Sequence, residues 1–383
     1  MDELATLDAL TRCLPQQRRV KTQNGKRLTK YVMSFASLGW YRLPCMSIVK
    51  ERFGQELSIF AGDSTPDAAI PLVGVHDLEQ VRLHNRFHAR QVLTQHIPWR
   101  QYLAADVLLL DLNPRMPYIW VLLCLRRLMM KRTVLWGHLW PRAGRYSKSS
   151  FVRSLMRRMA STVLTYTQSQ ARELVSIQPR AHVVAAPNAL FSRRHFVFDT
   201  GQTRDSVIYV GRLQASKKPM LLLQAFEIVH RVQSHIRLVI VGDGEQLSDL
   251  RSQAECSSAH EQIEFHGYVD DYRVLRTLYG KAFVSSSPGY VGLSVTQSLS
   301  FGVPMVIARD EPHAPEIEAA VEGENSVFFE SNDPIALANA ILKVLHDATE
   351  WQRRGPDIAR ITADKYSVEI MAKGVIDALV GRG

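Results

Sequence analysis

The chain has 383 residues, of which 46% are hydrophobic and 22% are charged, a composition that is ordinary for globular proteins and sufficient for two domains. Its four cysteines are widely scattered, without metal-ligand spacing, and predict reduced thiols. The N-terminus lacks the layout of a signal peptide, and the longest apolar run is too short to span a bilayer. We therefore expect a cytoplasmic protein that is neither secreted nor integral to the membrane.

The net charge of +10 is unevenly distributed. Residues 1–195 carry 29 Lys and Arg against 12 Asp and Glu, a balance of +17, whereas residues 196–383 carry 18 against 25, a balance of −7. No acidic residue lies between Asp111 and Glu173, a stretch that holds twelve basic ones. This asymmetry predicts that the first half faces a polyanionic surface.

The first half predicts a Rossmann-like domain over residues 1–195, after a loosely ordered segment at 1–28. Its expected strands and helices alternate along the chain. The strands are expected at 31–35, 57–61, 106–111, 133–137, 162–166 and 182–185, and the helices at 43–53, 117–130 and 149–160.

The second half alternates more regularly and predicts a parallel, doubly wound sheet over residues 196–365. A last helical stretch near 364–381, assigned to a segment 366–383, is expected to cross back onto the first domain. The expected strands are 206–210, 237–241, 263–265, 282–285, 304–308 and 326–329, and the helices 219–233, 245–256, 271–280, 293–301, 313–322 and 334–348.

Two segments of the second half carry features that hold phosphate. The strand at 206–210 ends in Gly211 and is followed by Arg212 and Lys217, while residues 288–304 place glycines before a helical run. Cations and a helix N-terminus together suit a diphosphate, which in a nucleotide-sugar is also a leaving group that needs charge stabilisation. The alternative is a pair of solvated surface cations, and the neighbouring Lys218 could take the place of Lys217.

Together with these two segments, residues 241–245 and 265–269 make the chain resemble the retaining glycosyltransferases of family 4 over roughly residues 206–345. Members of that family have the two-Rossmann GT-B fold. The resemblance implies two α/β domains that face each other across a cleft. It also implies that Arg212 and Lys217 clamp the donor diphosphate. The donor would further contact residues at or near strand ends and at the helix start, namely Gly211, Gly242, Tyr268, Val269, Gly292, Leu293 and Ser294.

The chain departs from the family at two positions. Gly289 and Gln297 stand where most members have glutamates that contact the donor sugar and the ribose. Gln297 can still accept a hydrogen bond through its amide oxygen, and the Pro-Gly-x-Val-Gly-Leu form resembles a subgroup of bacterial polysaccharide transferases. Glu316 is a further donor-side candidate, either in place of a missing carboxylate or as an acid that satisfies a helix dipole.

In the first half, His138 follows the strand at 133–137 and resembles the subgroup's cleft histidine, although a lone histidine is more often structural. Ser37, Gly39 and Trp40 lie where the family has a glycine-rich loop on the acceptor side.

The basic stretch surrounds an apolar helix at 116–130. This pattern suits docking on an anionic leaflet; the alternative is a buried helix with solvated arginines.

These features predict an enzyme that moves a hexose, with retention, from a UDP- or GDP-sugar to a lipid-diphosphate-linked saccharide in cell-surface polysaccharide biosynthesis. No metal or other cofactor is expected, and the enzyme would associate peripherally with the inner face of the cell membrane. One alternative is a nucleotide-sugar epimerase of the same fold, although the matching carboxylates are absent. Another is a basic protein that binds membrane or nucleic acid without catalysis, although no RNA-binding motif is evident.

Overall fold

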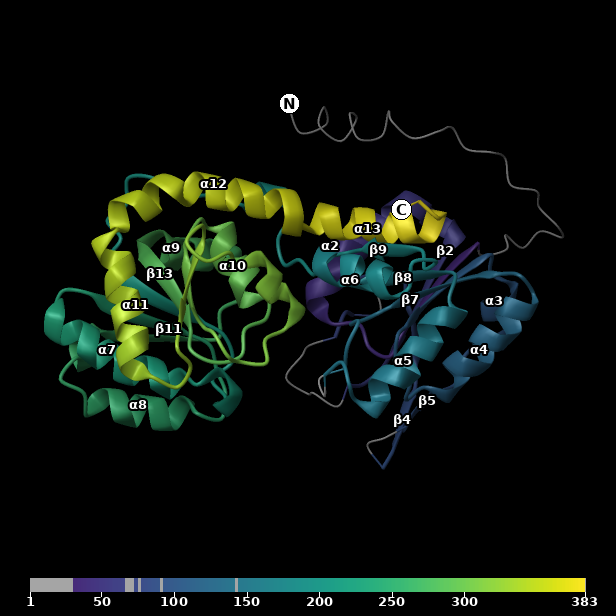
Figure 1. Ribbon diagram of the computed structural model, residues 1–383, viewed down its shortest axis with the longest axis horizontal. Helices are drawn as coiled ribbons and strands as arrows, with labels where there is room; N and C mark the ends of the chain where they lie inside the picture. The colour runs from purple at the N-terminus through teal and green to yellow at the C-terminus, as the bar shows by residue number, and fades with distance from the viewer. Residues whose placement is uncertain (1–29, 66–71, 75–76, 90–91, 142–143, 383) are drawn as a thin grey trace.

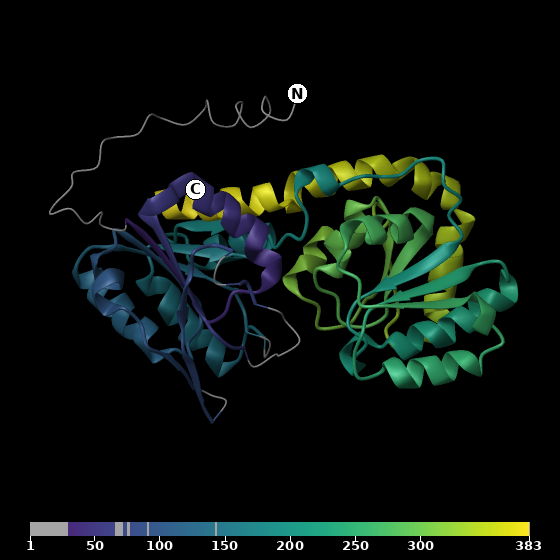
Figure 2. The ribbon, with the colours of Figure 1, turned by 180° about the vertical axis from the view of Figure 1, so that it is seen from behind.

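Two α/β domains lie side by side in the computed structural model, which describes residues 30–382 except 66–71, 75–76, 90–91 and 142–143. The segment 1–28, expected to be loosely ordered, lies outside these residues. Two C-terminal helices run along the same side of both domains (Figure 1), and the view from behind shows the same arrangement (Figure 2).

The N-terminal domain is built on a seven-stranded parallel sheet of order β3-β2-β1-β6-β7-β8-β9. β1, for example, is buried along its whole length, as a parallel strand covered on both faces requires. The strands are β1 (Tyr31–Phe35), β2 (Leu57–Gly62), β3 (Val81–Leu83), β6 (Val107–Asp111), β7 (Arg132–Trp136), β8 (Thr162–Thr165) and β9 (Val183–Ala185).

Helices and a hairpin complete this domain. Each strand and helix expected in this half is present within two residues of its expected bounds, whereas β3, the hairpin β4–β5, α3 and α6 were not expected. These remaining elements are η1 (Trp40–Arg42), α2 (Leu43–Phe53), η2 (Gly54–Glu56), β4 (Asn85–His88), β5 (Val92–Gln95), α3 (Trp99–Ala104), α4 (Pro117–Leu128), α5 (Lys148–Met159) and α6 (Gln168–Ile177).

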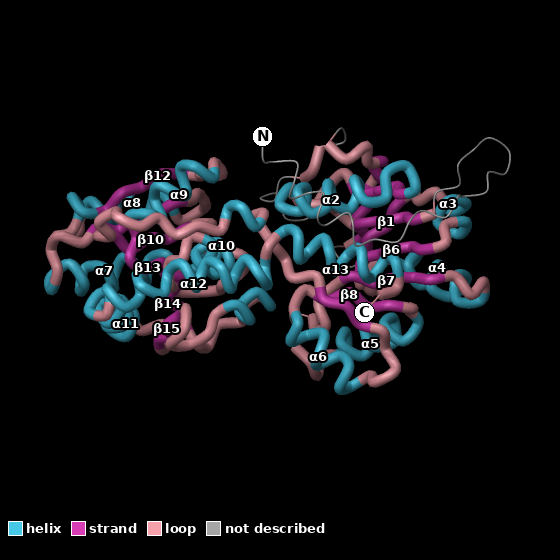
Figure 3. Tube along the Cα trace, turned by 90° about the horizontal axis from the view of Figure 1, so that it is seen from above, coloured by secondary structure: helices cyan, strands magenta, loops and turns pink. Residues whose placement is uncertain are grey.

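The C-terminal domain has a six-stranded parallel sheet of order β12-β11-β10-β13-β14-β15, and Figure 3 shows the two sheets side by side in separate halves of the molecule. Its strands are β10 (Ser206–Val210), β11 (Arg237–Val241), β12 (Ile263–Gly267), β13 (Ala282–Ser287), β14 (Met305–Ala308) and β15 (Ser326–Phe329). Its helices are α7 (Pro219–Val232), α8 (Leu247–Glu255), α9 (Tyr272–Lys281), α10 (Ser294–Ser300) and α11 (Pro334–His346), with shorter turns η3 (Arg193–His195), η4 (Ala215–Lys217) and η5 (His260–Gln262).

One expected helix of this domain is wrong. Residues 313–322 contain only the 3₁₀ turn η6 (Pro315–Ala319). Ala314 is extended, and its N–H donates to the carbonyl of Val291 at 2.9 Å, so no helix can begin before Pro315. The chain then turns at Gly323, where φ is 77°, to enter β15.

The strand order reverses at one point in each sheet, beside the strand that comes first in the chain. In the N-terminal sheet the reversal lies between β1 and β6, and in the C-terminal sheet it lies between β10 and β13. Loops diverge at the carboxyl end of such a reversal and leave a crevice, which is where ligands of doubly wound sheets bind. The two reversal points therefore mark the places to look for a site.

The C-terminal helices connect the domains. α12 (Ala348–Tyr366) was not expected before residue 364. It contains Gly355-Pro356, a pair typical of a helix break, and Gly355 packs so tightly that a Cβ there would lie 2.2 Å from Phe198. After Ser367, α13 (Val368–Val380) joins the hydrophobic core of the N-terminal sheet. Arg132 of β7 fixes the far end of α13 by donating to the carbonyls of its last turn at 3.0 and 3.1 Å.

Candidate functional site

The two segments that the sequence singles out for phosphate meet at the C-terminal reversal point. The N–H of Tyr290 donates to the carbonyl of Ser216 at 2.9 Å. The Lys217 ammonium donates to the carbonyl of Tyr290 at 2.7 Å and lies 4.6 Å from the centre of its ring. The loop after β10 and the loop after β13 are thus joined into one unit.

Lys217 is a half-buried cation at this junction. Burial and the neighbouring charge of Arg212 lower the pKa of Lys217 to about 8, against the opposing influence of Glu316. Lys218 has a left-handed backbone, with φ of 51°, and its ammonium pairs with Glu311. Of the two lysines, Lys217 is therefore the one directed at the junction.

Glycines allow the strand-end loops to stack. Gly242 has φ of 148°, and a Cβ there would lie 1.9 Å from the carbonyl oxygen of Gly211. The N–H of Gly242 donates to the carbonyl of Gly267 at 2.7 Å. Gly211, Gly242 and Gly267, which end or follow β10, β11 and β12, therefore form one continuous edge beside Arg212.

Gly289 and Gly292 differ in whether the surrounding structure has room for a side chain. A Cβ at Gly289 would lie 2.5 Å from the carbonyl oxygen of Ser216, so a side chain cannot fit while the two loops are joined. At Gly292 φ is not positive and a Cβ would meet nothing closer than 3.9 Å. Gly289 is thus needed for loop packing, whereas Gly292 leaves open space at the start of α10.

The beginning of α10 presents polar groups. Leu293 is the N-cap residue, and Gln297 lies one turn further along, half-buried. The Ser294 hydroxyl is buried and has no hydrogen-bond partner among the described residues, and the same holds for Ser286 at the end of β13. Buried hydroxyls without partners are rare and mark a place where a ligand or water can supply the bond.

His313 supports this loop and was missed by the sequence reasoning. Its Nδ1 accepts the N–H of Val291 at 3.1 Å, and its Nε2 donates to the carbonyl of Ala308 at 2.8 Å. Burial lowers the pKa of His313, which favours the neutral ring that this pair of bonds needs. No signal in the sequence distinguishes it, because it is one of thirteen histidines.

Glu316 lies in η6, between the domains. It is 6% exposed, and its Oε1 accepts the Asn188 side-chain amide at 2.7 Å, while its Oε2 has no partner among the described residues. Glu318, two residues on, accepts the backbone N–H groups of Gln168 and Ser169 at the start of α6. η6 thus links the loops around Lys217 to the N-terminal domain.

The remaining donor-side candidates lie beyond β12. Tyr268 is 62% exposed, whereas Val269 is half-buried and packs on the cluster around Ile208 and Val239. Only Tyr268 therefore offers a side-chain surface to a ligand here.

On the N-terminal domain, only some of the predicted acceptor-side residues line a cavity. Ser37 and Gly39 line a cavity of about 210 Å³ at the reversal point between β1 and β6, whereas Trp40 does not line it and is 42% exposed. His138 follows β7, and its ring contacts that of Tyr166, with centroids 4.5 Å apart. Tyr166 also lines the cavity, so His138 and the loop after β1 share one edge of the sheet.

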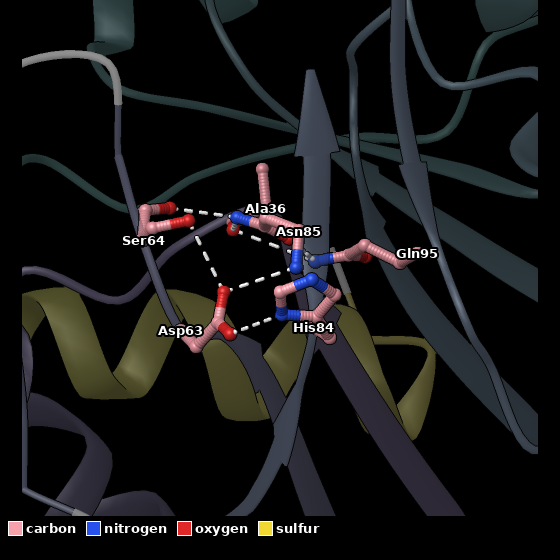
Figure 4. Close-up of polar contacts among 6 residues, drawn as sticks. All are labelled: Ala36, Asp63, Ser64, His84, Asn85 and Gln95. Carbon is pink, nitrogen blue, oxygen red and sulfur yellow. Dashed lines mark hydrogen bonds and ion pairs between the residues drawn. The ribbon is translucent and has the colours of Figure 1, made fainter.

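A polar network holds the loop after β1 in place (Figure 4). The carbonyl of Ala36 accepts the Asn85 amide at 2.9 Å, and Gln95 donates to the oxygen of the same amide at 2.7 Å. Asp63 accepts the N–H of Asn85 at 3.0 Å and lies 2.8 Å from the His84 ring. These bonds lower the pKa of Asp63, so its charge is stabilised by the network.

Only part of the basic stretch is exposed on the surface of the domain. Arg126 is fully buried and donates to the carbonyls of Tyr102 at 2.6 Å and Ala105 at 3.0 Å, and Arg157 is 2% exposed. Arg157 donates to the carbonyl of Leu139 at 2.8 Å. The expectation that the basic residues of this stretch all contribute to a docking surface is therefore wrong for these two, because their guanidinium groups bond to backbone carbonyls inside the domain. The outer faces of α4 and α5 nevertheless expose apolar side chains: Val121, Leu125, Leu128, Phe151 and Leu155.

Comparison with known proteins places the C-terminal half in a family. Residues 192–358 match the family Glycosyl transferases group 1. The alpha-monoglucosyldiacylglycerol synthase of Streptococcus pneumoniae is 29% identical over 144 residues, which are 37% of this chain and 31% of that protein. A Campylobacter jejuni α-1,4-N-acetyl-D-galactosaminyltransferase is 27% identical over 155 residues, 39% of this chain and 41% of that protein. The aligned segments thus span less than half of these relatives.

The fold extends over both domains. Anabaena HepE in complex with UDP superposes with a TM-score of 0.68 at 14% identity, covering 92% of this chain and all of that one. The same protein with UDP-glucose gives a TM-score of 0.63 at 15% identity, with 92% and 99% covered. The chain therefore has the two-domain GT-B fold, and its residues 192–358 match the glycosyltransferase group 1 family.

Proposed function

We propose that the protein is a retaining glycosyltransferase of family 4 that transfers a sugar from a nucleotide-diphosphate-sugar to a lipid-linked saccharide. The junction at the C-terminal reversal point supports this proposal most strongly. It brings Arg212, Lys217 and the open start of α10 to one crevice edge. Two cations and free hydroxyls in that position suit the diphosphate of a donor.

The chemistry assigned to this junction is electrostatic. As the sugar leaves, negative charge grows on the diphosphate, and Arg212 and Lys217 stabilise it without a protein nucleophile or a metal ion. The departing phosphate then helps to take the proton of the acceptor hydroxyl on the same face, which retains the configuration. His138 is assigned to the cleft, beside the sugar or the acceptor.

The absence of the family's two glutamates fits this assignment. The close approach at Gly289 excludes a side chain there, so no carboxylate can reach a donor from that position while the loops are joined. Gln297 keeps an acceptor for the ribose without a charge. We assign the chain to the subgroup of bacterial polysaccharide transferases that share this form. Glu316 is the acid whose charge acts to raise the pKa of Lys217.

Lipid-linked acceptors are suggested by the relatives. The Streptococcus protein is named for a glucosylated diacylglycerol, and the Campylobacter protein for a saccharide on PP-undecaprenol. An acceptor of this kind is held in a membrane, and an enzyme that uses it has to reach the membrane surface.

The outer faces of α4 and α5 provide a surface for this contact, which we call the α4–α5 face. Leu128 is 81% exposed and Phe151 is 75% exposed. Three exposed cations lie on the same two helices: Arg127, Lys148 and Arg158. Apolar side chains framed by cations suit an anionic leaflet, and we propose that this face docks on the inner face of the cell membrane. None of the helices in the described part of the chain is long and apolar enough to cross a membrane.

The donor assignment is tested by nucleotide binding and by transfer. UDP, GDP and their sugars are added to the full chain, and the bound nucleotide is expected to raise the melting temperature. Arg212→Ala should then lower transfer by about a hundredfold or more without lowering the melting temperature of the free protein. Arg273→Ala, an exposed arginine on α9, is the matched control. Near-normal transfer by Arg212→Ala would exclude the assignment.

The membrane assignment is tested with vesicles. The double variant Leu128→Ser and Phe151→Ser should bind anionic vesicles at least about tenfold more weakly, because two apolar side chains no longer insert. Ile335→Ser on α11, where the isoleucine is 60% exposed, is the control on the other domain. Equal loss in the control, or tighter binding to RNA than to vesicles, would contradict the α4–α5 face as a membrane surface.

A further inference from the structure

The segment that follows β14, residues 309–314, contacts both of the loops assigned to the donor diphosphate. We call this segment the β14 loop. It leaves the sheet one strand away from the C-terminal reversal point and leads into η6. Glu311 contacts the loop after β10, and His313 contacts the loop after β13. One short segment is thus bonded to both sides of the junction.

His313 and its neighbour fix one peptide unit of the loop after β13. The N–H of Val291 donates to Nδ1 of His313 at 3.1 Å, and the carbonyl of Val291 accepts the N–H of Ala314 at 2.9 Å. Every peptide bond in the described ranges is trans. In a trans peptide the carbonyl and the following N–H point in opposite directions. The N–H of Gly292 is therefore directed away from the β14 loop.

These contacts require a neutral ring at His313. Its Nε2 donates to the carbonyl of Ala308 at 2.8 Å, which leaves the lone pair of Nδ1 for the N–H of Val291. Burial lowers the pKa of His313, and the charge of Lys217 acts in the same direction, whereas the Ala308 carbonyl and Glu311 oppose them. At pH 7.5 the ring is neutral and can accept this bond.

Glu311 fixes the turn that follows Lys217. Its side chain is 10% exposed and pairs with the ammonium of Lys218, which also donates to Oδ1 of Asn332 at 2.5 Å. Lys218 and Asn332 have φ of 51° and 66°, a backbone that residues other than glycine rarely adopt. The left-handed turn at Lys218 takes its side chain to Glu311, while Lys217 donates to Tyr290. The ion pair therefore stabilises a strained turn beside the assigned cation.

We propose that Glu311 and His313 are positioning residues for the donor diphosphate, which set the place of Lys217 relative to the N–H of Gly292. This inference rests on the proposed function. The N–H of His313 donates to the carbonyl of Glu311 at 2.7 Å, so the two side chains extend from one tight turn. An acid at this place disfavours an anionic ligand by its charge. The contribution assigned to Glu311 is the geometry of the turn at Lys218.

The first test compares UDP with uridine, which has no phosphate, on the full chain at pH 7.5. Calorimetry measures UDP binding, and saturation-transfer NMR measures uridine binding. His313→Ala should raise the dissociation constant of UDP about tenfold, because the Val291 peptide is no longer held. His313→Asn keeps an oxygen acceptor near the place of Nδ1 and should bind UDP within about threefold of wild type. Uridine should bind all three proteins equally.

The second test uses the sign of a charge effect. Glu311→Gln removes a negative charge, so charge alone predicts tighter binding of UDP, which is an anion. Loss of the ion pair with Lys218 predicts the opposite, and we expect the dissociation constant of UDP to rise about fivefold. Asp310→Asn makes the same change of charge at the adjacent, exposed position and is the matched control. It should not weaken UDP binding.

The outcomes separate this inference from the proposed function. Weaker UDP binding by His313→Ala and Glu311→Gln, with uridine unchanged and with rescue by His313→Asn, supports the positioning role. If UDP binds wild type and either of the first two variants does not weaken it, if uridine weakens in parallel, or if His313→Asn does not rescue binding, the positioning role is overturned and the donor assignment stands. GDP and guanosine replace these probes if UDP does not bind wild type. If neither nucleotide binds wild type, the proposed function fails and this inference fails with it.

Discussion

The two reversal points of the molecule lie at the same place in their sheets but differ in charge. At the C-terminal one, the loop after β10 presents Arg212 and Lys217, and Lys217 donates to Tyr290 in the loop after β13. At the N-terminal one, the loops after β1 and β6 present a carboxyl, Asp111, beside a single guanidinium, Arg42. The same backbone topology thus carries two cations in one domain and a carboxyl beside a guanidinium in the other, because the side chains at the strand ends differ.

Both sites hold a charge against burial. Burial lowers the pKa of Lys217 to about 8 and raises that of Asp111 to about 6. In each case the charged form, which is present at neutral pH, is the form that burial disfavours. The free protein is therefore less stable with this group than it would be with a neutral residue at the same position. Groups kept at such a cost are typical of binding and catalytic sites.

The largest expected effect comes from breaking the C-terminal junction. Gly289→Ala places a Cβ against the carbonyl of Ser216 and should separate the two loops. We expect about a hundredfold loss of transfer and a destabilisation of about 1–3 kcal/mol, as for other overpacked positions. Transfer assays and denaturant unfolding measure the two effects.

Gly292→Ala is the matched control, because a Cβ there has room and φ is not positive. It should leave the free energy of unfolding nearly unchanged while weakening donor binding, because the methyl group fills the open space. Equal behaviour of the two variants would show that the junction does not shape the donor crevice.

A smaller effect is expected from pH. Lys217 loses its proton as the pH rises through about 8, so the dissociation constant of UDP, measured by calorimetry, should stay level below pH 7.5 and rise about tenfold between pH 8 and 9. Lys217→Arg keeps its charge across this range and should remove the rise. A rise that persists in Lys217→Arg would assign the titration to another group.

An effect of similar size is expected on stability at the N-terminal point. Asp111 has a higher pKa when folded than when unfolded, so the folded protein binds more protons between the two values and stability falls as the pH rises through this window. Asp111→Asn should therefore stabilise the protein by about 1–2 kcal/mol above pH 6, with no gain below pH 4. Urea unfolding at pH 4 and pH 7.5 measures this; destabilisation at pH 7.5 would show that Asp111 serves the fold alone.

Sequence patterns predicted most of the strands because parallel strands are buried on both faces and appear as short apolar runs, as in β1 and β10. They also located the loops around Arg212 and Gly292, since glycine and cations after a strand are local signals. They failed at α12, where Gly355-Pro356 is typical of a helix break, and at η6, where a distant hydrogen bond from Ala314 to Val291 decides the start of the turn.

The amino-acid sequence by itself determined the two-domain α/β architecture and the cations of the second half, because apolar periodicity and strand-end residues are local properties. Only the tertiary structure decided that Lys217 rather than Lys218 is directed at the junction, that Gly289 is needed where the loops touch, and that Arg126 is buried. It also brought Arg42, Asp111 and Tyr166 to one cavity. These assignments depend on contacts between residues far apart in the chain, and such contacts leave no pattern in a single sequence.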